Sequence, residues 1–343
     1  MTSSSAVRGL TRVLDAALDR SVLLGYSRVG PALRRRWWPA DPKPGSMSGQ
    51  RVVVTGATSG IGEAMVASFV ELGATVHVLG RNPDKVRTVV ADVRRTHPTA
   101  DLVEEVCDVG DLAAVRAWTD DLSSRVDALH GIVHNAGVLA EERQESPQGH
   151  EQGLAVHVLG PHLMTERLLP LLGAGPGTVV WMSSGGMYTS GLRTTEDEVE
   201  YREVPAEEYD GVRAYARTKR MQVVLAEAWS TRLRGGEVLV ESCHPGWAAT
   251  PGVTDALPGF DKVMGPLLRD ARSGADTAVW LVATRPHSAG TSHFWHDRAP
   301  RPTTYPVQRR ADATAVHAFL TQVSAMTDTV WPAPVMAVPS PRG

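Results

Sequence analysis

The stretch Arg51-Val52-Val53-Val54-Thr55-Gly56-Ala57-Thr58-Ser59-Gly60-Ile61-Gly62 decides the fold of this chain. Its first five residues are a β-branched run typical of a buried strand, and an amphipathic helical pattern follows the last glycine. The three glycines allow a tight turn and close packing of the helix on the strand. A strand, a glycine-rich turn and a helix in this order predict a βαβ unit that holds a pyrophosphate at the helix N-terminus. Taken alone, the motif also fits a purely structural turn.

Outward from this turn, β-branched runs alternate with amphipathic stretches from residue 50 to about residue 295. We predict strands at 51–55, 75–79, 102–106, 131–134, 178–182, 238–243 and 293–295. Helices are expected at 61–72, 84–96, 112–126, 151–172, 212–233 and 275–283. This alternation predicts the α/β class, a doubly wound, mainly parallel sheet of seven strands (a Rossmann fold) in a single domain with an N-terminal helical arm.

Three segments are expected along the chain: a basic amphipathic arm (1–47), the nucleotide-binding domain (48–300), and a C-terminal helix with a Pro-rich tail (301–343). The arm carries eight Lys and Arg against three Asp, and its apolar residues recur at helical spacing. One interpretation is a helical arm packed on the domain or on a neighbouring subunit, which leaves a homo-oligomer open. The other is peripheral membrane contact through basic and Trp side chains.

The composition narrows the class of protein. A net charge of −3 gives no reason to expect nucleic acid as a partner, and 42% hydrophobic residues are ordinary for a globular chain. The two cysteines follow apolar runs, where free thiols are usually buried. No run reaches the ~20 apolar residues of a membrane span, and no signal peptide is apparent, so we expect a cytoplasmic protein, at most peripheral to a membrane.

The cofactor end begins at the first helix, where Thr58, Ser59, Gly60 and Ile61 would surround a pyrophosphate. The second strand ends in Arg81-Asn82, where an NAD-selective enzyme would be expected to place an acid. Because Arg81 offers a fork of donors suited to a 2′-phosphate, NADP(H) is predicted over NAD(H). An ordinary surface arginine is the alternative.

Two further motifs follow predicted strands at the same edge of the sheet. Asp108-Val109 comes after the third strand, and Asn135-Ala136-Gly137 after the fourth. We expect both at the adenine side of a bound dinucleotide, although Asp and Gly also favour turns for their own reasons.

The reacting end pairs Tyr215 with Lys219, four residues apart and so on one face of a helix. Ser184 ends the fifth strand, and Pro245-Gly246 followed by Thr250 comes after the sixth. With the glycine turn and Asn135-Ala136-Gly137, these motifs stand in the order of the short-chain dehydrogenase/reductase family. The chain resembles that family over roughly residues 50–300, and within it the branch near the retinol-dehydrogenase-like enzymes.

The resemblance implies a hydride transfer between a nicotinamide and a carbonyl or alcohol. Tyr215 would exchange a proton with the substrate oxygen, Ser184 would polarise the carbonyl, and Lys219 would lower the phenol pKa and hold the ribose. The cofactor residues would be Gly56, Thr58, Ser59, Gly60, Ile61, Gly62, Arg81, Asn82, Asp108, Val109, Asn135, Ala136, Gly137, Tyr215, Lys219, Pro245, Gly246 and Thr250. No metal is expected.

The substrate is expected to be a small hydrophobic aldehyde, ketone or alcohol, because Trp247, Leu257, Phe260 and Met264 would line its wall. Thirty residues separate Ser184 from Tyr215 and include the acidic run 196–200. That insertion would be either a solvated flap or a lid over the substrate.

One position departs from the family pattern. The family places an Asn on the fourth helix to pass protons from the lysine to solvent, and His157 stands there. An imidazole could take over the relay, which makes His157 a candidate catalytic residue. The alternative is a weakened nucleotide-binding pseudoenzyme that senses NADP(H).

Overall fold

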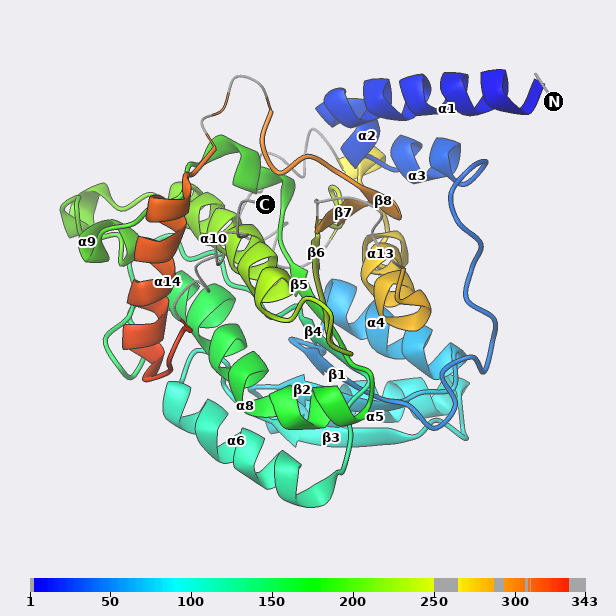
Figure 1. The fold of residues 1–343 in the computed structure, drawn as a ribbon. Helices are drawn as coiled ribbons and strands as arrows, with labels where there is room; N and C mark the ends of the chain where they lie inside the picture. Colours follow the sequence, from blue (N-terminus) through cyan, green and yellow to red (C-terminus); the bar gives the residue numbers. More distant parts are fainter. Residues whose placement is uncertain (1–2, 250–264, 287–292, 306–307, 309, 333–343) are drawn as a thin grey trace, which may run out of the picture.

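The computed structural model describes residues 3–249, 265–286, 293–305, 308 and 310–332. Within them lies a sheet of eight strands in the order β3-β2-β1-β4-β5-β6-β7-β8 (Figure 1). The strands are β1 (Arg51–Thr55), β2 (Thr75–Gly80), β3 (Leu102–Val106), β4 (Gly131–His134), β5 (Thr178–Met182), β6 (Leu239–Cys243), β7 (Phe294–His296) and β8 (Ala299–Pro300). The seven predicted strands are all present and parallel, and the doubly wound class is confirmed. The eighth strand is a short antiparallel addition to β7.

Strand β1 lies between β2 and β4, so the chain order reverses there. The reversal opens a crevice beyond the carboxyl ends of β1 and β4, which is where a ligand binds in a doubly wound sheet. The register sets Val52 opposite Val76 on one side and opposite Gly131 on the other. The glycine turn therefore stands directly at the crevice.

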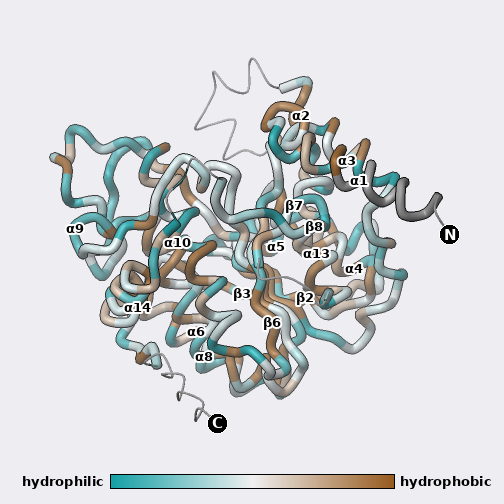
Figure 2. The backbone as a smooth tube through the Cα atoms, turned by 45° about the horizontal axis from the view of Figure 1, so that its top comes forward, coloured by the Kyte–Doolittle hydropathy of each residue, from teal (hydrophilic) through white to brown (hydrophobic). Residues whose placement is uncertain are grey.

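Helices cover both faces of the sheet, as Figure 1 shows. One layer contains α4 (Gly60–Glu71), α5 (Pro83–Thr96) and α13 (Ala271–Thr284). The other contains α6 (Leu112–Arg125), α8 (Gly160–Ala174), α10 (Gly211–Arg232) and α14 (Ala313–Thr327). Fully buried side chains such as Phe69 in the first layer and Trp229 in the second fill the space against the strands. Figure 2 shows the hydrophobic residues gathered along the central strands.

The helix predicted at 151–172 is interrupted. It consists of α7 (Gln152–Leu154), a π-helical turn η1 (Ala155–Leu159) and α8. Pro161 has no N–H to donate to the carbonyl of His157 four residues earlier, and the side chain of Gln222 donates to that carbonyl instead, at 2.9 Å. A π turn of this kind is often found at functional sites, and here it contains His157.

The N-terminal arm is helical and packs on the domain. It comprises α1 (Ser3–Arg20), α2 (Val22–Tyr26) and α3 (Val29–Arg34), and it lies beside β7 and β8 (Figure 1). Arg301 reaches Asp15 of α1 at 2.6 Å, and Arg34 of α3 reaches Asp297 at 2.7 Å. No helix in the described part of the chain is both long and apolar enough to cross a bilayer.

The long insertion before Tyr215 forms η2 (Gly185–Thr189), α9 (Glu196–Val199) and η3 (Ala206–Glu208). The side chain of Glu200 is buried, receives the backbone N–H of Glu151 at 2.8 Å and pairs with His150. The insertion is therefore anchored to the domain at this point and is not a wholly solvated flap. The predicted C-terminal helix is α14, whereas residues 333–343, most of the Pro-rich tail, lie outside the described residues.

Candidate active site

The glycine turn is built so that side chains cannot replace its glycines. Gly56 has φ +63°, and a Cβ there would lie 2.7 Å from the Cα of Ala136. A Cβ on Gly62 would lie 2.2 Å from the carbonyl oxygen of Gly56. Gly80 at the end of β2 likewise leaves room for the methyl group of Thr58. The turn is thus packed against the loops that follow β2 and β4.

The N-terminus of α4 fits an anionic group. Ser59 is the N-cap residue in extended conformation, yet its side chain makes no hydrogen bond to the first-turn amides. The first-turn N–H groups, including those of Ile61 and Gly62, therefore receive no side-chain cap from Ser59 and suit a phosphate. These residues fit the pyrophosphate of a dinucleotide.

Arg81 is exposed just after β2, and the described residues offer it no ion-pair partner. Its neighbour Asn82 has a structural role, because its side-chain oxygen caps α5 by accepting the N–H groups of Asp84 and Lys85 at 2.9 and 3.1 Å. Asn82 thus serves as a helix cap here, and a phosphate contact of Arg81 stays a prediction.

The loop after β4 is held by a residue that sequence reasoning missed. The hydroxyl oxygen of Thr55 accepts the backbone N–H groups of Asn135 and Ala136, each at 3.0 Å. The amide of Asn135 in turn donates to the carbonyl oxygens of Thr55 and Gly56. Asn135 and Ala136 therefore join the glycine turn to the loop after β4, whereas Gly137 lies against the ring of His157.

After β3, Asp108 is exposed and its carboxylate accepts the N–H of Gly110 at 2.9 Å. Val109 is buried, and its carbonyl oxygen lies 2.0 Å from the place where a Cβ on Gly160 would stand. The Asp108-Val109 pair thus has a turn-forming role of its own, at the edge of the sheet where we expected it.

Ser184, Tyr215 and Lys219 meet beyond the carboxyl end of β5. The Ser184 hydroxyl lies close enough to the Tyr215 phenol to lower its pKa, and Nζ of Lys219 lies 5.2 Å from the centroid of the Tyr215 ring. The ammonium nitrogen also donates to the carbonyl of Met182, the last residue of β5, at 2.8 Å. The three groups come from η2 and one face of α10, as their spacing predicted.

Burial controls the protonation of this cluster. It raises the pKa of the Tyr215 phenol, although the Ser184 hydroxyl acts in the opposite direction. It lowers the pKa of Lys219 to about 7. Burial therefore keeps the phenol protonated at physiological pH but makes it a weaker acid, so proton donation requires that the phenolate be stabilised as it forms.

His157 is engaged at both ring nitrogens. Its Nε2 accepts the N–H of Val138 at 3.0 Å, which leaves the proton on Nδ1, 2.8 Å from the hydroxyl of Thr218. That hydroxyl donates to the carbonyl of Tyr215 at 3.0 Å. Burial also holds the pKa of the imidazole well below its usual value. These bonds hold the loop after β4 against α10 through a neutral imidazole, and a proton relay through His157 stays a prediction.

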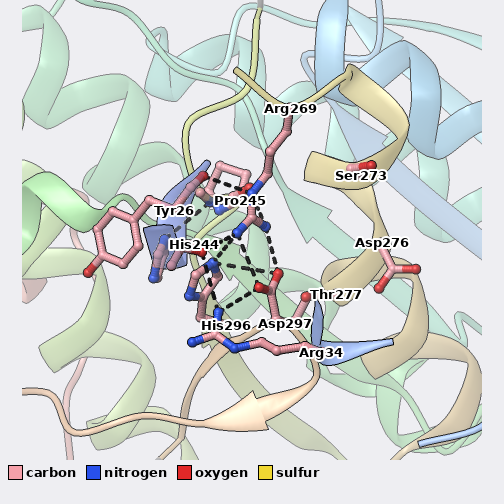
Figure 3. Close-up of polar contacts among 12 residues, drawn as sticks. Tyr26, Arg34, His244, Pro245, Arg269, Ser273, Asp276, Thr277, His296 and Asp297 are labelled. Atoms are coloured by element: carbon pink, nitrogen blue, oxygen red, sulfur yellow. Dashed lines mark hydrogen bonds and ion pairs between the residues drawn. The ribbon is translucent and has the colours of Figure 1, made fainter. Parts of the chain in front are cut away.

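Pro245 and Gly246 follow β6 and meet the N-terminal arm (Figure 3). Gly246 has φ +72°, and a Cβ there would lie 2.4 Å from Nε of Arg269 and 2.7 Å from the carbonyl oxygen of Tyr26. Thr250, Leu257, Phe260 and Met264 lie outside the described residues. Tyr26 and Arg269 were not predicted, because neither stands in a recognisable motif.

Two relatives match most of the chain. Dehydrogenase/reductase SDR family member 12 of Bos taurus is 30% identical, over 90% of this chain and 96% of that protein. Retinol dehydrogenase 14 of Mus musculus is 28% identical, over 81% of this chain and 86% of that protein. These alignments extend well beyond the nucleotide-binding half.

Solved structures agree in fold. A short-chain dehydrogenase from Shigella flexneri, complexed with NADP, superposes with a TM-score of 0.58 at 22% identity, over 74% of this chain and 98% of that one. A 3-ketoacyl-(acyl-carrier-protein) reductase from Brucella melitensis, complexed with NADH, gives 0.55 at 21% identity, over 70% and 93%. The family model for short chain dehydrogenases matches residues 50–193. This chain therefore belongs to the short-chain dehydrogenase/reductase family of oxidoreductases.

Proposed function

We propose that this enzyme uses NADP(H) to interconvert a carbonyl and an alcohol on a small hydrophobic substrate. The observation that carries the proposal is the convergence of three groups. The Ser184 hydroxyl lies near the Tyr215 phenol, and Lys219 lies beside the tyrosine ring. A bound reduced nicotinamide would supply the hydride.

The chain's own residues supply the proton and the orientation. The neutral phenol of Tyr215 gives its proton to the substrate oxygen, and the hydroxyl of Ser184 donates a hydrogen bond to the same oxygen. Lys219 stabilises the resulting phenolate and holds the cofactor ribose. His157 keeps α10 in place through Thr218. A panel of aldehydes and ketones tests the proposal: NADPH consumption with at least one hydrophobic carbonyl supports it, and none with any would count against it.

A hydrophobic substrate is supported by two observations. Tyr188 and the fully buried Met187 follow Ser184 in η2, and Trp247 follows the Pro245-Gly246 turn after β6. One relative is named for retinol, a hydrophobic alcohol. Within the panel we expect kcat/KM to rise with the apolar area of the carbonyl compound.

Arg81 is proposed to select NADP(H). Arg81→Ala should weaken NADPH binding by about 10- to 100-fold, because a charge-assisted contact to phosphate contributes about 1.5–3 kcal/mol. NADH affinity should not change. Isothermal titration with both coenzymes measures this. Lys85→Ala, an equally exposed cation in the first turn of α5, is the matched control; an unchanged NADPH affinity in Arg81→Ala would refute the assignment.

The arm is proposed to contact an anionic lipid surface. Five large hydrophobic side chains of α1 and α2 are 46–66% exposed, and α2 stands out as hydrophobic at the periphery in Figure 2. They are Val13, Leu14, Val22, Leu23 and Leu24. The exposed cations Arg20 and Arg28 flank them, so the face combines apolar area with positive charge.

Leu23→Glu should lower binding to phosphatidylserine-containing vesicles by about 10-fold or more, since burying one Leu contributes about 1.5–3 kcal/mol. Val330→Glu, which alters a more exposed apolar residue outside the arm (81% against 49%), should bind like the wild type. Flotation with and without phosphatidylserine gives the result. Absence of vesicle binding together with a dimer that Leu23→Glu dissociates would identify the face as a homo-oligomer contact instead.

A further inference from the structure

The N-terminal arm reaches the reacting end of the active site. Tyr26, the last residue of α2, is 3% exposed although α2 is a short peripheral helix. Its ring packs on the main chain of Gly185, where an added Cβ would lie 2.4 Å from Cε2 of the ring. Gly185 is the residue after Ser184. The aromatic side chain of the arm therefore supports the turn that holds the serine hydroxyl.

The same tyrosine also contacts the loop after β6. Its ring meets His244 edge-on with centroids 4.6 Å apart, and its carbonyl oxygen accepts the N–H of Trp247 at 2.8 Å. Gly246 leaves the space that this carbonyl occupies. Tyr26 thus stands between the Ser184 turn and the Pro245-Gly246 turn, the two loops that border the substrate oxygen and the cofactor ring.

Buried polar contacts hold Tyr26 in this position. Arg269, 1% exposed, donates to the carbonyl oxygens of Gly25, Tyr26 and Ser27 and is fixed by Asp297 at 2.6 Å (Figure 3). The Tyr26 hydroxyl lies near that of Tyr305, which donates to Asp19 at 3.1 Å. An arm that served only as a tether would need no buried arginine on three consecutive carbonyls.

We propose that Tyr26 is a positioning residue of the active site, which places the Ser184 hydroxyl by packing on Gly185. The kinetic tests of this inference rest on the proposed function, whereas the hydrogen-exchange test does not. Because removal of the ring lets the Ser184 turn shift, and small displacements of reacting groups are costly, Tyr26→Ala should lower kcat by about 10-fold or more. KM and NADPH affinity should stay close to wild type. Tyr26→Phe keeps the ring and should restore kcat.

A double-mutant cycle separates positioning from loss of stability. In a Ser184→Ala background, Tyr26→Ala should cause no further loss of kcat, since both changes act on one hydroxyl. All rates are referred to the concentration of sites that bind NADPH. Val330→Ala, which truncates an exposed apolar residue outside the arm, is the control and should not affect kcat. Full additivity of the Tyr26 and Ser184 effects would overturn the proposal.

Hydrogen exchange provides a readout independent of turnover. The amides of Gly186 and Met187 are bonded to Ser184 within the turn. They should exchange faster in Tyr26→Ala, and at the wild-type rate in Tyr26→Phe and Val330→Ala. Unchanged exchange in Tyr26→Ala would refute the inference whatever the activity. If the wild-type protein turns over no carbonyl, the proposed function is refuted. The exchange rates of the Gly186 and Met187 amides would then still decide whether Tyr26 positions the Ser184 turn.

Discussion

Tyr215→Phe is expected to lower kcat for carbonyl reduction by about 10²- to 10⁴-fold, the contribution of a general acid. The phenyl ring fills the same space, so the packing of α10 and the contact with Lys219 should persist. NADPH affinity and the free energy of unfolding should therefore stay near the wild-type values. Steady-state kinetics measures the fall in kcat. NADPH fluorescence measures the affinity and counts the competent sites.

The control for this substitution is Tyr209→Phe, which removes a hydroxyl bonded to Glu151 at 3.0 Å but not the one near Ser184. It should leave kcat unchanged. A Tyr215→Phe variant that turns over at the wild-type rate would mean that another group donates the proton. A variant that also loses NADPH binding would mean that the hydroxyl has a role in the cofactor site.

Arg269→Met is expected to cause the largest loss of stability, about 3–5 kcal/mol. The substitution keeps much of the side-chain volume but leaves the buried carboxylate of Asp297 with one cation fewer. It also removes the guanidinium hydrogen bonds to the carbonyl oxygens of residues 25–27. Urea denaturation should show the loss, and the arm should become sensitive to limited proteolysis before the domain.

Arg272→Met is the matched comparison. Arg272 lies three residues further along the chain, in the first turn of α13, and its side chain is 68% exposed and pairs with Glu71. An exposed ion pair contributes only about 0–1 kcal/mol, so this variant should unfold almost like the wild type. Equal stability losses in the two variants would show that the buried contacts do not anchor the arm.

Local sequence was enough for the sheet and for much of the candidate site. The strand at 51–55, the glycine turn and the helix after it form one continuous signal, since Gly56 and Gly62 are required by close contacts and Gly60 has a φ of +55°. Tyr215 and Lys219 face the same way because helical spacing fixes that relation. The position of Ser184 at the carboxyl edge of the sheet followed from its place after the fifth strand, because parallel strands present their carboxyl ends at one edge.

Contacts between segments far apart in the chain could not be predicted from the sequence. Tyr26 lies on Gly185 and Arg269 lies on the arm only because the chain folds back over β7, and no spacing or periodicity records that path. At the π turn, the side chain of Gln222 in α10 donates to the carbonyl oxygen of His157, and no local pattern in the sequence predicts this contact. The imidazole was expected to relay protons, whereas its bonds to Val138 and Thr218 follow from the tertiary position of α10.

The most direct test follows the transferred hydride. The wild-type enzyme would be given a hydrophobic ketone and NADPH deuterated at the transferable position of the nicotinamide, and the alcohol product analysed by mass spectrometry. Hydride transfer at a site formed by Ser184, Tyr215 and Lys219 predicts one deuterium on the carbinol carbon, at a rate that Tyr215→Phe reduces sharply. An alcohol product without deuterium, or equal labelling rates in both proteins, would contradict it.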